Sequence, residues 1–193
     1  MCRVDVLPGT TIQTTLDKHD VAQRILNNIF ATGGLVLSQV SQLTNLENHV
    51  IQNWVKRGFL SSPIGKRYSK DQFCRIVIIN MLKDTLRIDT IAGMLSYING
   101  VLTDKSDDII DDSCLYNYYV NLLVEINNLG ISNGFVDHKT LNKALSELLA
   151  DFKEVYPGAK KRLQKVLAVM STAHTSAMLC KKAELMAVEL YLD

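Results

Sequence analysis

Helical periodicity is the feature of this sequence that most constrains its fold. Along most of the chain, apolar residues recur three and four positions apart, as they do at Val21, Ile25 and Ile29. This spacing places them on one face of a helix. The glycines and the three prolines lie mainly between such segments, where they end helices. With 193 residues, 47% of them hydrophobic, the chain can bury a substantial core. The sequence therefore predicts an all-α protein.

Five short helices are expected before residue 100. The apolar spacing predicts them at residues 20–30, 37–44, 47–56, from 69 onward and 89–99. Gly58 is expected to end the third, because glycine readily adopts the left-handed conformation of a helix C-cap. Ser69 and Gln72 form a capping-box pattern that opens the fourth. Asp89 is expected to cap the fifth.

The second half of the chain begins with an acidic connector at residues 104–112. Five carboxylates and one lysine occur there, and such a run usually lies in solvent. Helical stripes follow at 115–126 and from Asp137 to Phe152, and residues 159–192 are long enough for a single helix. From Ala177 onward the last segment is apolar on almost all sides. We therefore expect this end to be covered, either inside a C-terminal domain or as a dimer seam.

The helix expected at 47–56 carries a continuous polar stripe. Its buried face is formed by Val50, Ile51, Trp54 and Val55, and the opposite side presents four polar residues at positions i, i+3, i+4 and i+7, namely His49, Gln52, Asn53 and Lys56. Asparagine and glutamine can bond adenine edges in a DNA major groove, and lysine can reach guanine or phosphate. A solvated helix face is the alternative interpretation.

The segments around this helix favour the DNA interpretation. A short helix and a tight turn at residues 44–46 precede it, which is the geometry of a helix-turn-helix. A turn-rich segment at 59–68 follows and ends in Lys66, Arg67 and Tyr68, where a small wing would place the cations beside phosphates. Between Ser38 and Arg75, six lysines and arginines stand against two acids, so this module carries about +4 in a chain of net charge +1.

These residues resemble two families. Ile51, Trp54, Gly58-Phe59-Leu60, Pro63 and Arg67-Tyr68-Ser69 occur in the order and spacing of the MerR-type DNA-binding domain. The phrases at residues 33–40, 51–58 and 106–113 are similar to a bacterial family described as domain of unknown function 1836. The MerR resemblance implies a winged helix-turn-helix at 35–100. It implies base contacts from the recognition helix, whose DNA-contacting arginine falls on Gln52, and phosphate contacts from Lys66 and Tyr68.

Two departures from the MerR pattern restrict what the resemblance implies. The wing is several residues shorter and lacks one of the usual aromatic residues. The MerR effector region, a long dimer helix flanked by metal-binding cysteines, is not recognisable. Metal sensing is therefore not expected. The division that follows is an N-terminal helical extension at 1–34, a reader at 35–100, the connector at 101–112 and a C-terminal helical domain for dimerisation or effector binding at 113–193.

Other chemistry finds little support in the sequence. Cys2, Cys74, Cys114 and Cys180 form no metal-ligand spacing, and four scattered histidines have no catalytic partners in the sequence. Tyr116, Tyr118 and Tyr119 are expected to pack in the core, and the alternative is that they line a small pocket. No phosphate loop, nucleophile elbow or calcium loop occurs. We expect no enzyme, no cofactor and no bound metal.

The sequence thus predicts a cytoplasmic, DNA-binding transcription regulator. No window of 18 consecutive apolar residues and no signal peptide is found, so no membrane association is expected. The predicted DNA contacts are His49, Gln52, Asn53, Lys56, Arg57, Lys66, Arg67 and Tyr68. A homodimer is expected, because two half-sites give enough interface for specific affinity, and a small-molecule effector is conceivable. The alternative is an adaptor that keeps the helix-turn-helix fold but binds another protein.

Overall fold

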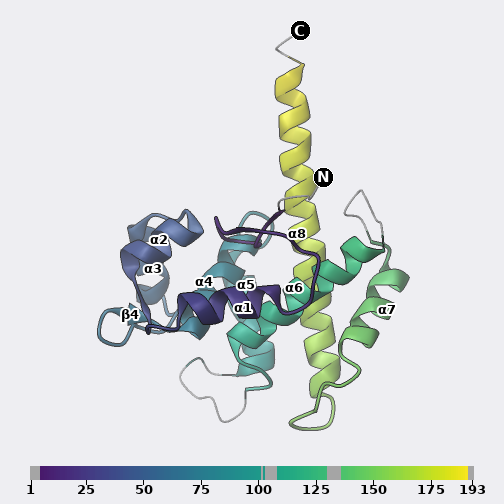
Figure 1. Cartoon of the computed structure of the whole chain (residues 1–193), viewed down its shortest axis with the longest axis horizontal. Helices are drawn as coiled ribbons and strands as arrows, with labels where there is room; N and C mark the ends of the chain where they lie inside the picture. The colour runs from purple at the N-terminus through teal and green to yellow at the C-terminus, as the bar shows by residue number, and fades with distance from the viewer. Residues whose placement is uncertain (1–4, 101, 103–107, 130–135, 191–193) are drawn as a thin grey trace.

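The computed structural model describes residues 5–100, 102, 108–129 and 136–190, and these are mostly helical (Figure 1). The helices are α1 (Val21–Ile29), α2 (Leu37–Thr44), α3 (Asn48–Lys56), α4 (Lys70–Leu82), α5 (Ile88–Asn99), α6 (Asp112–Asn128), α7 (His138–Leu148) and α8 (Ala159–Glu189). The strands are β1 (Asp5–Val6), β2 (Gln13–Thr14), β3 (Leu35–Val36) and β4 (Arg67–Tyr68). The predicted all-α class is confirmed, with two short strand pairs added.

Helix α4 is the centre of the core. Every residue from Phe73 to Ile79 is buried, which suits a helix that is apolar nearly all round. It packs against α6 and α8. The predicted capping box starts it: Gln72 N donates to Ser69 Oγ at 3.2 Å, and Ser69 N donates to the Gln72 side chain at 2.9 Å.

A hairpin that the sequence did not predict lies at the N-terminus. Strands β1 and β2 pair antiparallel, with Val6 opposite Gln13. The Tyr116 hydroxyl donates to Pro8 O at 2.8 Å, and Asn80 Nδ2 donates to Gly9 O at 2.9 Å. The hairpin is therefore fastened to α6 and α4. Strands of two residues are too short to produce an alternating pattern, which explains why the sequence predicts only the helix at 20–30 in this segment.

The start of α5 also differs from the prediction. Arg87 occupies the N-cap position, and Asp89 lies in the first turn instead of capping the helix. A carboxylate in the first turn is still favourable, because it faces the positive end of the helix dipole.

The described part of the acidic connector is solvated only in part. Ile109 and Ile110 are buried, and Ile109 N donates to Ile98 O at 3.0 Å. Asp112 is the first residue of α6, where its carboxylate pairs with Arg75. The expectation of a solvent-exposed stretch holds for Asp111 and is wrong for the two isoleucines, which anchor the chain to α5. Residues 101 and 103–107 of the connector lie outside the described residues.

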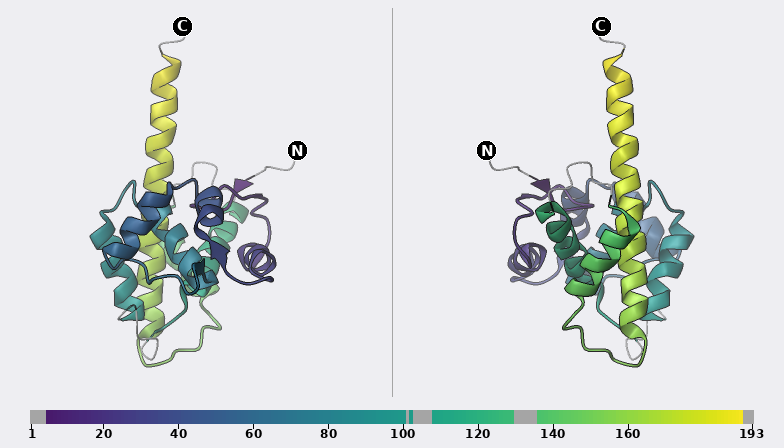
Figure 2. Two further views of the ribbon diagram at one scale, coloured as in Figure 1. Left: turned by 90° about the vertical axis from the view of Figure 1, so that its left-hand side faces the viewer. Right: turned by 90° about the vertical axis from the view of Figure 1, so that its right-hand side faces the viewer.

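Helix α8 is a single helix of 31 residues, as predicted. Its first half crosses the body of the molecule, and its second half projects beyond it (Figure 2). The expectation that this end is covered is not met within the described residues, because residues 178–190 are all exposed. The division of the chain into four segments stays a prediction.

Candidate nucleic-acid interface

Helices α2 and α3 form a compact two-helix unit. Residues 45–47 connect them, and Asn45 adopts the left-handed conformation (φ 54°) that reverses the chain direction. Leu46 is buried beneath the turn, and Ser41 Oγ donates to its carbonyl at 2.5 Å. Thr44 Oγ1 donates to Val40 O at 2.7 Å. These contacts fix the angle at which α3 leaves α2.

The two faces of α3 differ as the sequence indicates. Ile51 and Trp54 are buried, and Val50 and Val55 are half-buried. The four residues of the polar stripe, His49, Gln52, Asn53 and Lys56, are all exposed. His49 Nδ1 lies 3.0 Å from a Glu47 carboxylate oxygen, and both side chains are mostly solvated. The structure therefore leaves one amide-rich surface of α3 available to a partner.

A short hairpin stands beside α3. Ile64 and Arg67 exchange two backbone hydrogen bonds of 3.1 and 2.9 Å. Gly65 and Lys66 form the turn between them, both with positive φ, as two-residue hairpins require. Strand β4 continues this hairpin and pairs antiparallel with β3, with Val36 opposite Arg67. The turn thus holds Lys66 at its tip. Ile64 is 87% exposed, and no sequence pattern had marked it.

Gly34 enables the β3–β4 pairing. A Cβ atom at this position would lie 2.7 Å from the Tyr68 carbonyl oxygen, closer than real side chains come. The Arg67 guanidinium donates to the Gly34 carbonyl at 2.7 Å. The base of the hairpin is therefore held by close backbone contact.

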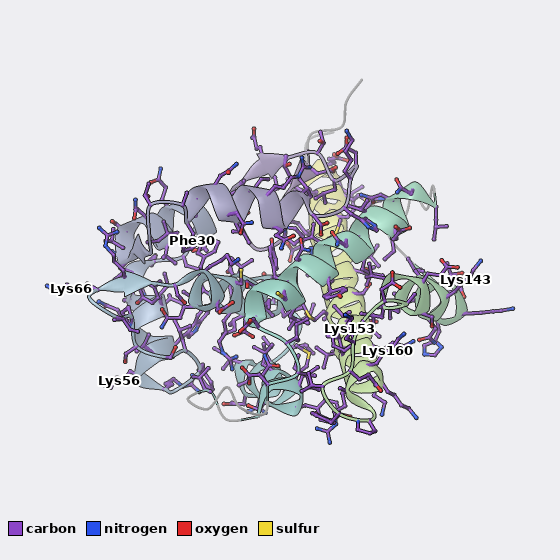
Figure 3. All side chains as sticks on the ribbon, turned by 60° about the horizontal axis from the view of Figure 1, so that its bottom comes forward. Phe30, Lys56, Lys66, Lys143, Lys153 and Lys160 are labelled. Atoms are coloured by element: carbon purple, nitrogen blue, oxygen red, sulfur yellow. The ribbon has the colours of Figure 1, made fainter. Side chains whose placement is uncertain are left out.

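The exposed cations of this region lie at one end of the molecule. Figure 3 shows Lys56 of α3 and Lys66 of the hairpin at the same edge, far from Lys143 of α7. The Arg57 guanidinium stacks 4.6 Å from the Phe59 ring centroid and lies 3.8 Å from an Asp89 oxygen. Lys56, Arg57, Lys66 and Arg67 are all exposed.

Two residues of the basic segment are placed differently from expectation. Tyr68 is only 3% exposed, so its ring packs in the core instead of facing a phosphate. This burial raises the pKa of its hydroxyl. Arg75 is 6% exposed. Its Nε donates to Phe59 O at 2.9 Å, and its Nη1 lies 3.2 Å from Asp112 Oδ2. The charge of +4 counted along the sequence therefore includes one cation that is neutralised inside the protein.

The tyrosines of α6 divide between core and surface. Tyr116 and Tyr119 are fully buried, as core packing predicts, and the Tyr119 hydroxyl bonds His174 Nδ1 at 2.5 Å. Tyr118 lines a polar cleft of about 650 Å³ between α1, α6 and α7, together with Asp20, Asn117 and Asn121. Both amides bond the Asp20 carboxylate, and these bonds lower its pKa.

No group of three or more histidine, cysteine or acidic side chains is arranged to hold a metal in the described ranges. Within the same residues, no helix has the length and apolar character needed to cross a membrane.

Comparison with known proteins gives a family but no activity. The model of a family described as "Domain of unknown function (DUF1836)" matches residues 20–119, which include the two-helix unit and the hairpin. A Bacillus subtilis protein, "Uncharacterized protein YkrK", is 34% identical over 89 residues. The matched segment covers 42% of this chain and 38% of that protein. No solved structure matches the chain.

Proposed function

The chain belongs to the family described as a domain of unknown function (DUF1836), and we propose that its α2–α3 unit is a MerR-like helix-turn-helix that binds double-stranded DNA. In this proposal α3 is the recognition helix and the 64–67 hairpin is a minimal wing. The protein would act as a cytoplasmic regulator of transcription.

The observation that carries the proposal is the exposed face of α3. Its inner residues, Ile51 and Trp54, are buried, so the helix presents a rigid outer surface. That surface consists of an imidazole, two amides and an ammonium group, and the exposed Glu47 carboxylate adjoins it at the His49 end. Gln52 and Asn53 can each pair with an adenine edge through two hydrogen bonds. Such a face matches base edges better than it matches an apolar protein partner.

The hairpin supplies the second part of the interface. Lys66 at its tip and Lys56 at the end of α3 lie at the same edge of the molecule (Figure 3). Cations at the end of a recognition helix and on a neighbouring hairpin can contact the phosphates that border a groove. Arg57 and Arg67 extend this set. Tyr68 is left out of the proposed contacts because its ring is buried.

The proposed regulator would bind DNA as a homodimer. One such unit offers a small interface, and helix-turn-helix proteins gain affinity by binding two half-sites related by symmetry. The polar cleft beside Tyr118 offers a location for a small-molecule effector.

Fluorescence-anisotropy titration tests the DNA-binding proposal. The purified protein is titrated against a random duplex and against DNA upstream of its own gene, at about 50 and about 200 mM salt. We expect binding to both at low salt, tighter binding to one sequence, and a marked loss at high salt. Gln52→Ala should change the sequence preference by about 1–3 kcal/mol at one base pair.

Absence of binding to either duplex at low salt would contradict the proposal. The adaptor interpretation would then take its place, provided that a partner protein is bound through the same face of α3. Burial of His49, Gln52, Asn53 and Lys56 in a protein complex would establish that alternative.

A further inference from the structure

The second half of α8 carries an apolar surface that nothing in the described chain covers. Leu163, Leu167 and Met170 in its first half are buried, whereas residues 178–190 are all exposed. Figures 1 and 2 show this end standing clear of the other helices. Its large apolar side chains are between 42% and 77% exposed: Met178, Leu179, Leu185, Met186, Val188 and Leu190. Leu179, Met186 and Leu190 lie on one side of this helix, and Met178, Leu185 and Val188 lie on the other.

The sequence of this end has the spacing of a coiled-coil seam. Starting at Thr172, steps of four and three residues alternate and reach Ser176, Leu179, Ala183, Met186 and Leu190 in turn. Residues at these steps align along one side of a helix and face a single partner helix. At about 100° per residue, this seam lies roughly opposite the face that α8 buries in the body. The seam is therefore free to receive a second helix.

The residue sizes along the seam favour an antiparallel second copy. The seam has small residues near the body, Thr172 and Ser176, and large ones at its tip, Met186 and Leu190. If two copies cross near Lys181, Leu190 of one meets Thr172 of the other, and Met186 meets Ser176. Leu179 then meets Ala183, so every layer combines a large residue with a small one. A parallel pair would instead place small against small and leave gaps.

The base of the projecting helix has hollows on both sides of the small residues. One, of about 230 Å³, is bounded by Val136 and Leu141, and another, of about 360 Å³, by Thr85 and Leu86. Thr172 and Ser176 line both. The Thr172 hydroxyl donates to Ala168 O at 2.9 Å, so its methyl group is left to face a partner. The tip of a second α8 would therefore meet space that its large side chains can fill.

We propose that two copies of this chain dimerise through the second halves of their α8 helices, packed antiparallel from Thr172 to Leu190. The overlap is roughly 27 Å long at 1.5 Å per residue. It is isologous, because each copy contributes both the small and the large residues of every layer. The inference specifies the surface of the homodimer proposed above, but it does not depend on DNA binding and is tested without DNA.

A matched pair of variants tests this interface. Met186 lies in the seam and Val188 lies on the opposite side of the same helical turn, and both side chains are 57% exposed. Sedimentation equilibrium of the full chain should show a dimer. Met186→Glu should raise the dimer dissociation constant tenfold or more, because it removes a central contact of the interface. Val188→Glu should leave the dissociation constant nearly unchanged. Far-UV circular dichroism checks that both variants keep the helix content of the wild type.

A variant on the receiving side tests the orientation. Ser176→Glu should weaken the dimer as Met186→Glu does, because the two positions meet in the antiparallel packing. A dimer that Met186→Glu abolishes and Ser176→Glu leaves intact would overturn this packing. A monomeric wild-type chain would overturn the proposal altogether. The same holds if the monomer's α8 instead binds phosphatidylcholine vesicles or another protein.

Discussion

At the scale of single residues, a buried ion pair joins two segments far apart in the sequence. Arg75 of α4 and Asp112 of α6 have side chains only 7% and 12% exposed, and Nη1 lies 3.2 Å from Oδ2. The Arg75 Nε also donates to Phe59 O, which holds the segment after α3 against α4. The Arg75 side chain therefore links the two-helix unit to α4 and α6.

Removal of one partner of this pair should be costly. We expect Asp112→Asn to lower the free energy of unfolding by about 2–4 kcal/mol, because it leaves a buried guanidinium without its counter-charge. Urea denaturation measures the difference. Asp89→Asn is the control, since the Arg57–Asp89 pair is exposed and 3.8 Å long and should contribute less than about 1 kcal/mol. Equal losses in the two variants would show that the buried pair has no special role.

Gly34 gives a second residue-scale prediction. Gly34→Ala places a methyl group 2.7 Å from the Tyr68 carbonyl, and the required shift should cost about 1–3 kcal/mol of stability. Gly93→Ala is the matched control, because a Cβ there meets nothing within 4 Å inside α5. That change should stabilise the protein by up to about 1 kcal/mol. Thermal or urea unfolding of both variants measures the contrast, and a stable Gly34→Ala would contradict the close β3–β4 contact.

Lys66 is the residue whose replacement should affect DNA binding without altering the fold. Lys66→Ala should weaken binding to all sequences and reduce the slope of log affinity against log salt by about one. Lys143→Ala removes an exposed charge at the far side of the molecule and should change neither quantity (Figure 3). Anisotropy titrations over a series of salt concentrations measure both. If log affinity falls with log salt at the same slope in the two variants, a phosphate contact at the hairpin tip is excluded.

At the scale of elements, a histidine between α6 and α8 should make stability depend on pH. Burial lowers the pKa of His174 to about 4 from an ordinary 6.5, and its ring bonds the Tyr119 hydroxyl. Between these values the unfolded chain binds a proton that the folded chain does not. The free energy of unfolding should therefore fall as the pH drops from about 6.5 to about 4, by up to roughly 3 kcal/mol.

The variant His174→Gln tests this pH dependence. Glutamine keeps an acceptor for Tyr119 but does not titrate, so the wild type should lose more stability than the variant on going from about pH 7 to about pH 4.5. Urea unfolding at several pH values gives the difference. Parallel stability curves for the two proteins would contradict the burial of a neutral His174.

Most of the helices could be predicted from the sequence because they bury a periodic face. Helix α3 needs only the spacing of Ile51 and Trp54, and its polar side follows from the same periodicity. Contacts between distant segments leave no such local signal. The pairing of Arg75 with Asp112 and the burial of Tyr68 depend on how α4, α6 and the strands pack. For that reason a count along the sequence overestimates the cations and aromatic groups available on the candidate interface.

At the scale of the whole molecule, two exposed surfaces lie on different parts of one packed body. The α2–α3 unit with its hairpin stands at one side, and the second half of α8 projects from the body (Figures 1 and 2). The buried α4 contacts α2, α6 and α8, so it connects the two regions through packed side chains. In the proposed dimer, this rigid connection would fix the separation of the two recognition helices and hence the spacing of DNA half-sites.

The central claim is that the exposed face of α3 contacts DNA, and photo-crosslinking tests it most directly. A benzophenone side chain is placed at position 52 in one protein and at position 143 in another, and each is irradiated with duplex DNA at low salt. We predict that the group at position 52 crosslinks to the duplex and the group at position 143 does not. Equal crosslinking from both positions, or none from position 52 while the protein still binds DNA, would contradict the claim.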